Sequence, residues 1–155
     1  MDIPKFLDLG VEFETQISKL YETIAELSGD PPIATRLKTL ANEEVNHANV
    51  LRRGKTYYDE MPDAFSGITM DDNDAREGFE EAKMFHASLG HGKAPLLECL
   101  KKMLEFEKRF EKIHLDTSMK VTEPSLKKLF VDLMRGDQSH ILVLKGLIES
   151  FGENG

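Results

Sequence analysis

Hydrophobic residues recur every three or four positions along four long stretches of this chain, a spacing that predicts four amphipathic helices. The expected helices span about residues 4–27, 33–58, 95–121 and 122–151. Each has about 24 to 30 residues and a length of roughly 36–45 Å. The Ser-Gly-Asp-Pro-Pro run at 28–32 predicts the end of the first helix, and Thr122 is the expected N-cap of the fourth.

The connections between these helices predict two hairpins. Short turns join the first helix to the second and the third to the fourth, so each pair is expected to be antiparallel. The hairpins cover about 3–58 and 95–151, with a crossover at about 59–94 whose helical spacing over 74–89 predicts a short helix. The sequence therefore predicts an all-α fold with a single domain over 1–155. Its architecture is an antiparallel four-helix bundle of two helical hairpins joined by a long crossover.

Ionisable side chains interrupt the apolar stripe of every predicted long helix. In the second helix, the stripe passes from Leu40 to Glu44 and His47 before it returns to an apolar residue, in steps of four, three and four. The other three helices are interrupted in the same way near their middles. The ionisable residues at stripe positions are Glu14, Glu44, His47, Glu107, Asp137 and His140.

These six residues form two matching sets. Each member of the second set follows its counterpart in the first by 93 positions; the sets are Glu14, Glu44, His47 and Glu107, Asp137, His140. Four carboxylates and two histidines are the ligands with which four-helix bundles hold a pair of iron or manganese ions. The repeat therefore predicts a dimetal site between the four helices.

The alternative is that these residues are ordinary charged or core positions. For any one of the six residues taken alone this alternative is favoured, because a Glu-x-x-His pair often lies on one face of a helix by chance. Burying four unpaired carboxylates, however, costs several kcal/mol each and would unfold a small domain. No Lys or Arg occupies the stripes near them. Two divalent cations would neutralise the four negative charges, so metal binding explains the six residues together.

Two further residues occupy equivalent places in the repeat, seven positions after the first glutamate of each set. Tyr21 and His114 can each hydrogen-bond a ligand carboxylate, or fill core space with a polar tip in water. Both interpretations remain open from sequence. His86 and His91 have no counterpart in the repeat and are expected at the surface. Glu43, next to a candidate ligand, is expected to face water.

Composition narrows the class of protein. Residues are 40% hydrophobic and 31% charged, and the net charge of −8 argues against nucleic acid as a partner. No apolar run approaches the ~20 residues that span a membrane, and the N-terminus lacks a secretion signal. Cys99 is the single cysteine, so no disulfide or rubredoxin-type iron site is expected. A cytoplasmic location is the expectation.

The chain resembles the ferritin-like di-iron proteins, and among them the rubrerythrin-like branch, over nearly its whole length. The residues that carry the resemblance are Glu14 with Tyr21, the doublet Glu43-Glu44 before His47, and Glu107 with Asp137 and His140. The resemblance implies a ferritin-like arrangement of the bundle and a centre of two iron ions, with manganese or zinc as other possible metals. It also implies bridging or chelating roles for Glu44 and Glu107. The ligands of each ion would be completed by one terminal carboxylate and one capping histidine. The carboxylates are Glu14 and Asp137, and the histidines are His47 and His140.

Three features depart from the rubrerythrin pattern. The Cys-rich rubredoxin domain is missing from this sequence, so electrons would come from a separate donor protein. Asp137 stands where the pattern has glutamate, and its shorter side chain is expected to make the two ions unequal. Phe110 replaces the additional glutamate that follows the third-helix ligand, and Glu111 is expected at a solvated face rather than as a substitute.

Three functions follow as expectations. The first is a di-iron oxidoreductase that reduces hydrogen peroxide or activates dioxygen, working as a homodimer or larger homo-oligomer. The second is a ferroxidase of the iron-storage kind. The third is a non-enzymatic bundle whose metal ions are structural.

Overall fold

The computed structural model describes residues 2–91 and 94–154. Within these residues every regular element is helical and no strand occurs, which confirms the predicted all-α class. The elements are α1 (Ile3–Leu27), α2 (Pro31–Glu60), the 3₁₀ turn η1 (Pro62–Phe65), α3 (Asn73–Leu89), α4 (Leu96–Lys120) and α5 (Pro124–Asn154). The predicted crossover helix is therefore present as α3.

Two helix starts differ from the sequence prediction. Pro31 and Pro32 belong to the first turn of α2, where a missing N–H is harmless, and Asp30 caps this helix by accepting a hydrogen bond from the Ile33 N–H. At α5, Thr122 is not the N-cap. Glu123 caps the helix, because its carboxylate accepts the Leu126 N–H at 2.8 Å. α5 also continues past the predicted stop near residue 152.

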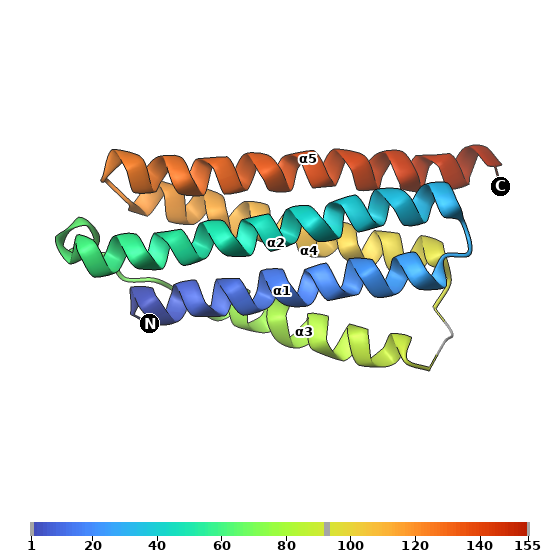
Figure 1. The fold of residues 1–155 in the computed structure, drawn as a ribbon, viewed down its shortest axis with the longest axis horizontal. Coiled ribbons are helices and arrows are strands. Elements are labelled where there is room, and N and C mark those ends of the chain that lie inside the picture. Colours follow the sequence, from blue (N-terminus) through green and yellow to red (C-terminus); the bar gives the residue numbers. More distant parts are fainter. Residues whose placement is uncertain (1, 92–93, 155) are drawn as a thin grey trace.

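The long helices form two antiparallel hairpins that pack side by side as a helical bundle (Figure 1). α1 pairs with α2, and α4 pairs with α5. α3 lies on the outside of the bundle, against α1 and α4. It approaches closely at Gly78, where an added Cβ would lie 2.6 Å from the Phe13 ring and from Arg109 Cδ. None of the described helices has an apolar stretch long enough to cross a membrane.

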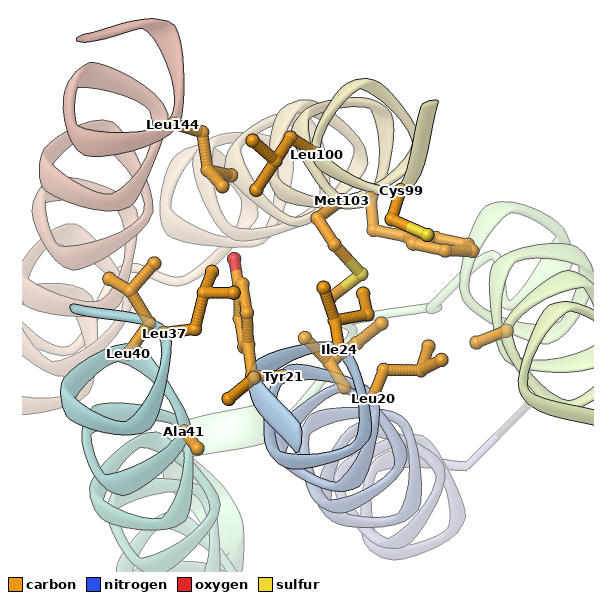
Figure 2. Packing of buried hydrophobic residues seen from close by; sticks show 14 of the residues in the cluster. Leu20, Tyr21, Ile24, Leu37, Leu40, Ala41, Cys99, Leu100, Met103 and Leu144 are labelled. Atoms are coloured by element: carbon orange, nitrogen blue, oxygen red, sulfur yellow. The ribbon is translucent and has the colours of Figure 1, made fainter. Parts of the chain in front are cut away.

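The hydrophobic core consists of two clusters at different heights in the bundle. One lies toward the α1–α2 turn and includes Tyr21, Leu37, Leu100 and Leu144, drawn from all four long helices (Figure 2). The other lies toward the α4–α5 turn, where Leu7, Leu51, Leu126 and Phe130 meet. On α2 and α5 the predicted ionisable residues separate the two clusters, whereas on α1 and α4 the first cluster extends past Glu14 and Glu107 to Phe13 and Phe110. The candidate site is thus a polar layer within an apolar core.

Candidate metal centre

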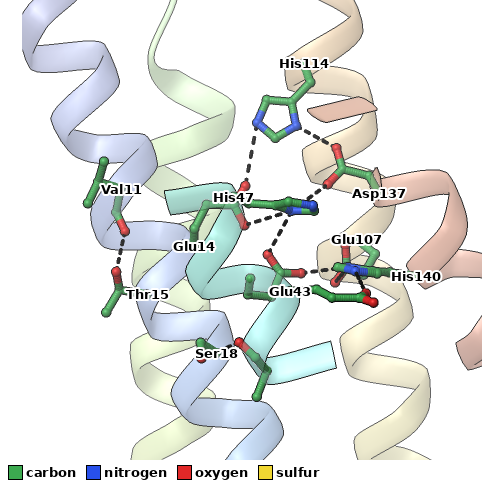
Figure 3. A network of polar contacts seen from close by, with 12 residues as sticks. Val11, Glu14, Thr15, Ser18, Glu43, His47, Glu107, His114, Asp137 and His140 are labelled. Carbon is green, nitrogen blue, oxygen red and sulfur yellow. Dashed lines mark hydrogen bonds and ion pairs between the residues drawn. The ribbon is translucent and has the colours of Figure 1, made fainter. Parts of the chain in front are cut away.

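The six predicted residues lie together at one level of the bundle: five of them are labelled in Figure 3, and Glu44 lies beside His47 and His140. The four carboxylates have no exposed surface at all, and His140 is 1% exposed. His47 is the most accessible of the six, with 13% of its side chain exposed. Each long helix contributes at least one of these side chains, so folding of the bundle is what assembles the site.

Glu44 occupies the middle of the cluster. Its Oε1 lies 2.9 Å from Nδ1 of His140, and its Oε2 lies 3.4 Å from Nδ1 of His47. The two imidazole rings come from α5 and α2 and stack with centroids 5.1 Å apart. One carboxylate therefore faces two histidines, with a separate oxygen toward each. This is the arrangement expected of a carboxylate shared between two neighbouring cations.

The other carboxylates surround these histidines. Glu107 Oε1 lies 3.2 Å from His140 Nδ1, whereas Glu14 Oε2 lies 3.9 Å from His47 Nδ1. Asp137 is turned toward the same side as Glu14: its Oδ1 lies 4.0 Å from His47 Nδ1. Its Oδ2 lies 2.6 Å from Nδ1 of His114. Asp137 and His140 belong to the same motif on α5, but Asp137 contacts His114 whereas His140 contacts Glu44 and Glu107.

Two groups of side chains bring ligand atoms within 4.8 Å of one another and could hold a metal ion. They are Glu44, His47, His140 and Glu14, His114, Asp137. All six predicted ligands except Glu107 belong to one of these groups. His114 is the addition. From sequence it was a possible hydrogen-bond partner of a ligand or a core residue, and the structure brings its ring nitrogens to the carboxylates of Glu14 and Asp137.

The site contains an unusual concentration of buried polar atoms that have no hydrogen-bond partner within the described chain. These atoms are both carboxylate oxygens of Glu14, Oε2 of Glu44, Nδ1 of His47, Oε2 of Glu107 and Oδ1 of Asp137. A buried unsatisfied polar group costs about 1–3 kcal/mol. All of these atoms belong to predicted ligands, and carboxylate oxygen with imidazole nitrogen is a donor set for iron, manganese or zinc. The residues present therefore fit a metal ion.

Burial also sets the charge of the metal-free site. It raises the pKa of Glu14, Glu107 and Asp137 well above the usual range, and the negative charge of Glu44 adds to this effect. Burial alone would raise the pKa of Glu44 too, but interactions with neighbours including His140 lower it. Hydrogen bonds with Glu107 and Glu44 outweigh the burial of His140 and raise its pKa to about 11. Burial thus favours protonation of these three carboxylates in the metal-free cluster, and bound cations would displace protons from them.

Two residues outside the predicted ligand set make hydrogen bonds to members of that set. The Tyr21 hydroxyl donates a hydrogen bond to Glu107 Oε1 at 2.7 Å. Of the two interpretations that the sequence left open for Tyr21, the structure therefore favours the hydrogen bond to a predicted ligand carboxylate. Glu43 was expected to face water, and this is only partly right. Its side chain is 47% exposed, but its Oε2 lies 2.6 Å from Nε2 of His140. A carboxylate on the far nitrogen of a ligating histidine fixes the ring and increases its basicity.

The remaining histidines lie away from the site. His86 is half-buried between α3 and α1, where Gln16 and Thr23 contact its two ring nitrogens at 2.7 and 3.0 Å. His86 is therefore partly buried where α3 packs on α1, and it belongs to neither group of possible metal ligands. His91 is exposed, as expected.

Gly136 makes room for the His47 ring. A Cβ atom at this position would lie 2.5 Å from His47 Nε2 and 2.8 Å from Cε1. The absence of a side chain thus allows α5 to approach α2 at the level of the site. Gly136 directly precedes Asp137, so one short segment of α5 provides both a carboxylate and the space for an imidazole from another helix.

Replacing Gly136 by alanine is expected to displace the His47 ring and weaken metal binding by about 10–100-fold, the range seen when ligand orientation is disturbed. Isothermal titration of the metal-free protein with Zn²⁺ measures this. The matched control is Gly146→Ala on the same helix, where a Cβ meets no atom within 4 Å. Equal affinities in the two variants would show that the close approach at Gly136 does not matter for binding.

Comparison of the chain with protein-family models, with curated proteins and with solved structures found no match.

Proposed function

We propose that this protein is a rubrerythrin-like, non-haem di-iron oxidoreductase of ferritin-like architecture that reduces hydrogen peroxide with electrons from a separate donor protein. The observation that carries the proposal is the position of Glu44, whose two oxygens face His140 and His47 separately at 2.9 and 3.4 Å. Unsatisfied carboxylate oxygens lie beside both histidines. This supports two neighbouring cations rather than one.

The negative charge of the four carboxylates also supports two cations. Glu14, Glu44, Glu107 and Asp137 would contribute four negative charges when ionised, and all four are fully buried. Two divalent cations neutralise them, whereas one leaves two carboxylates to be protonated or unpaired. Imidazole together with carboxylate suits iron, which can change its oxidation state. A pair of ferrous ions supplies the two electrons that cleavage of one O–O bond requires.

The surroundings restrict the substrate to a small molecule. The ligand carboxylates are fully buried, and α3 covers the bundle on the α1 and α4 side. The part of the site nearest to solvent is on the α2 and α5 side, at His47 and at Glu43 beside His140. Hydrogen peroxide and dioxygen are small enough to enter there. Peroxide takes up two electrons and two protons and leaves as two water molecules.

The test is a stopped-flow experiment on the anaerobic ferrous protein. Peroxide is expected to oxidise it rapidly, with one peroxide consumed for every two irons, and dioxygen is expected to react more slowly. Faster oxidation by dioxygen, with a shell-sized assembly on gel filtration, would favour iron storage instead. Zinc alone in the native protein, with no reaction of the iron-loaded form toward either oxidant, would leave a structural metal site.

A further inference from the structure

His114 and Tyr21 occupy equivalent positions in the 93-residue repeat but meet the site differently. Tyr21 places its hydroxyl 2.7 Å from Glu107 Oε1 and donates its only proton there. His114 lies between two carboxylates, with Nδ1 2.6 Å from Asp137 Oδ2 and Nε2 3.7 Å from Glu14 Oε1 (Figure 3). The two ends of the site are thus closed by different chemical groups.

The two contacts of His114 are not equivalent. The 2.6 Å contact with Asp137 is a short hydrogen bond, and when Asp137 is ionised its proton belongs to Nδ1. Nε2 then presents its lone pair to Glu14 Oε1. A distance of 3.7 Å is too long for a hydrogen bond, so two acceptors face each other without a proton between them. Both oxygens of Glu14 have no hydrogen-bond partner within the described chain.

A cation fits between these two acceptors. Transition-metal ions bind imidazole nitrogen and carboxylate oxygen at about 2.0–2.2 Å. Twice this distance exceeds the separation of Nε2 and Oε1, so one ion can contact both atoms with little movement of either side chain. Glu14, Asp137 and His114 already bring their ligand atoms within 4.8 Å of one another.

The apolar surroundings hold the His114 ring in this orientation. It is 4% exposed and stacks on Phe110 at a centroid distance of 5.9 Å with an interplanar angle of 3°. Phe130 contacts it from α5, with centroids 6.5 Å apart. The ring nitrogens therefore face the carboxylates because the remaining walls are aromatic and offer no polar partner of their own.

We propose that His114 is a third imidazole ligand of the metal centre, which binds through Nε2 the ion that Glu14 and His47 also face, while Asp137 orients the ring. The proposal rests on the metal centre argued above. It makes the two ion positions unequal. One has two imidazoles, and the other has His140 alone, because Tyr21 at the equivalent place donates its proton instead of offering a lone pair.

Anaerobic titration of the metal-free, full-length protein with Co²⁺ tests this assignment. A histidine bound to Co²⁺ keeps one ring N–H, whose strongly shifted proton signal disappears in D₂O. We expect three such signals from the native protein and two from His114→Gln. We also expect His114→Gln to bind one of its two Co²⁺ ions at least about 10-fold more weakly. His86→Gln, which removes a histidine outside the site, should leave both quantities unchanged.

The count of signals in the native protein decides between a ligand and a positioning role. Two signals, whatever the affinity of the variant, would overturn ligation by His114 while leaving the metal centre intact. Failure of the native protein to bind any Co²⁺ would instead remove the centre and the proposed function with it. If His114→Gln does not fold, His114→Gly with added imidazole replaces it. The imidazole should then restore tight binding of the second ion, and no restoration would count against the proposal.

Discussion

Exchange of Glu44 for glutamine is expected to abolish tight binding of both metal ions at once. The amide keeps the size of the side chain but removes its charge and leaves one oxygen where two now face His140 and His47. Disturbing an outer partner of a ligand already weakens binding by about 10–100-fold, so loss of a shared ligand should exceed this for each ion. Metal content after dialysis and isothermal titration measure the effect.

Glu105→Gln is the matched control for Glu44→Gln. It makes the same chemical change, and therefore the same change in net charge, at a side chain that is 70% exposed on α4. This variant should keep native metal content. Retention of one tightly bound ion by Glu44→Gln would mean that Glu44 serves a single ion, and the case for a shared carboxylate would fail.

The metal-free protein is expected to lose stability as pH rises from 6 to 8, while the metal-loaded protein gains it. Folding raises the pKa of Glu14, Glu107 and Asp137, so these groups stabilise the fold below their ordinary pKa and lose that contribution as pH rises toward the raised value. His140 acts in the same direction between its ordinary pKa of 6.5 and about 11.

Glu44 has the opposite sign, because folding lowers its pKa. Its contribution is complete above its ordinary pKa of 4.5 and stays constant between pH 6 and 8. At about 1.4 kcal/mol per pH unit, His140 alone changes the free energy of unfolding by up to about 2 kcal/mol between its ordinary pKa of 6.5 and pH 8. A fall in melting temperature of roughly 4–8 °C follows from this group for a chain of this size.

Differential scanning calorimetry with and without chelator measures both trends. Metal binding requires deprotonated ligands, so affinity rises with pH and the melting temperature of the loaded protein should rise with it. Glu14→Gln provides the internal comparison, because it should reduce the pH dependence of the metal-free form. A metal-free melting temperature that increases from pH 6 to 8 would contradict the proposed proton balance.

The helices and the six central residues could be predicted from sequence for one physical reason. Positions on the stripe of a helix face the core and are normally apolar. A carboxylate or imidazole at such a position breaks this rule, and such breaks mark functional sites. Glu44 and His47 were visible because Leu40 and Leu51 on either side kept the stripe in register. The same stripes placed α1, α2, α4 and α5 within a few residues of their ends.

The features that the sequence did not predict depend on distances between helices. The spacing of residues along one helix gives no information on these distances. Glu43 lies about 100° around α2 from Glu44 and was assigned to solvent. It meets His140 because α5 packs on that side. Asp137 contacts His114 and faces His47, and both contacts depend on how α5 packs against α4 and α2. The repeat located His114, but only the fold shows what its nitrogens face.

The polar layer also determines how the bundle holds together. It lies between the two hydrophobic clusters, and Ile113 is a partly buried residue that packs against both of them. Without metal, the unsatisfied polar atoms of this layer weaken the packing between the clusters, so we expect the two ends of the bundle to loosen more independently. Bound ions would connect all four long helices in this layer. Metal loading would then make the two ends of the bundle unfold as one cooperative unit. Hydrogen exchange would therefore slow at both ends when metal is added.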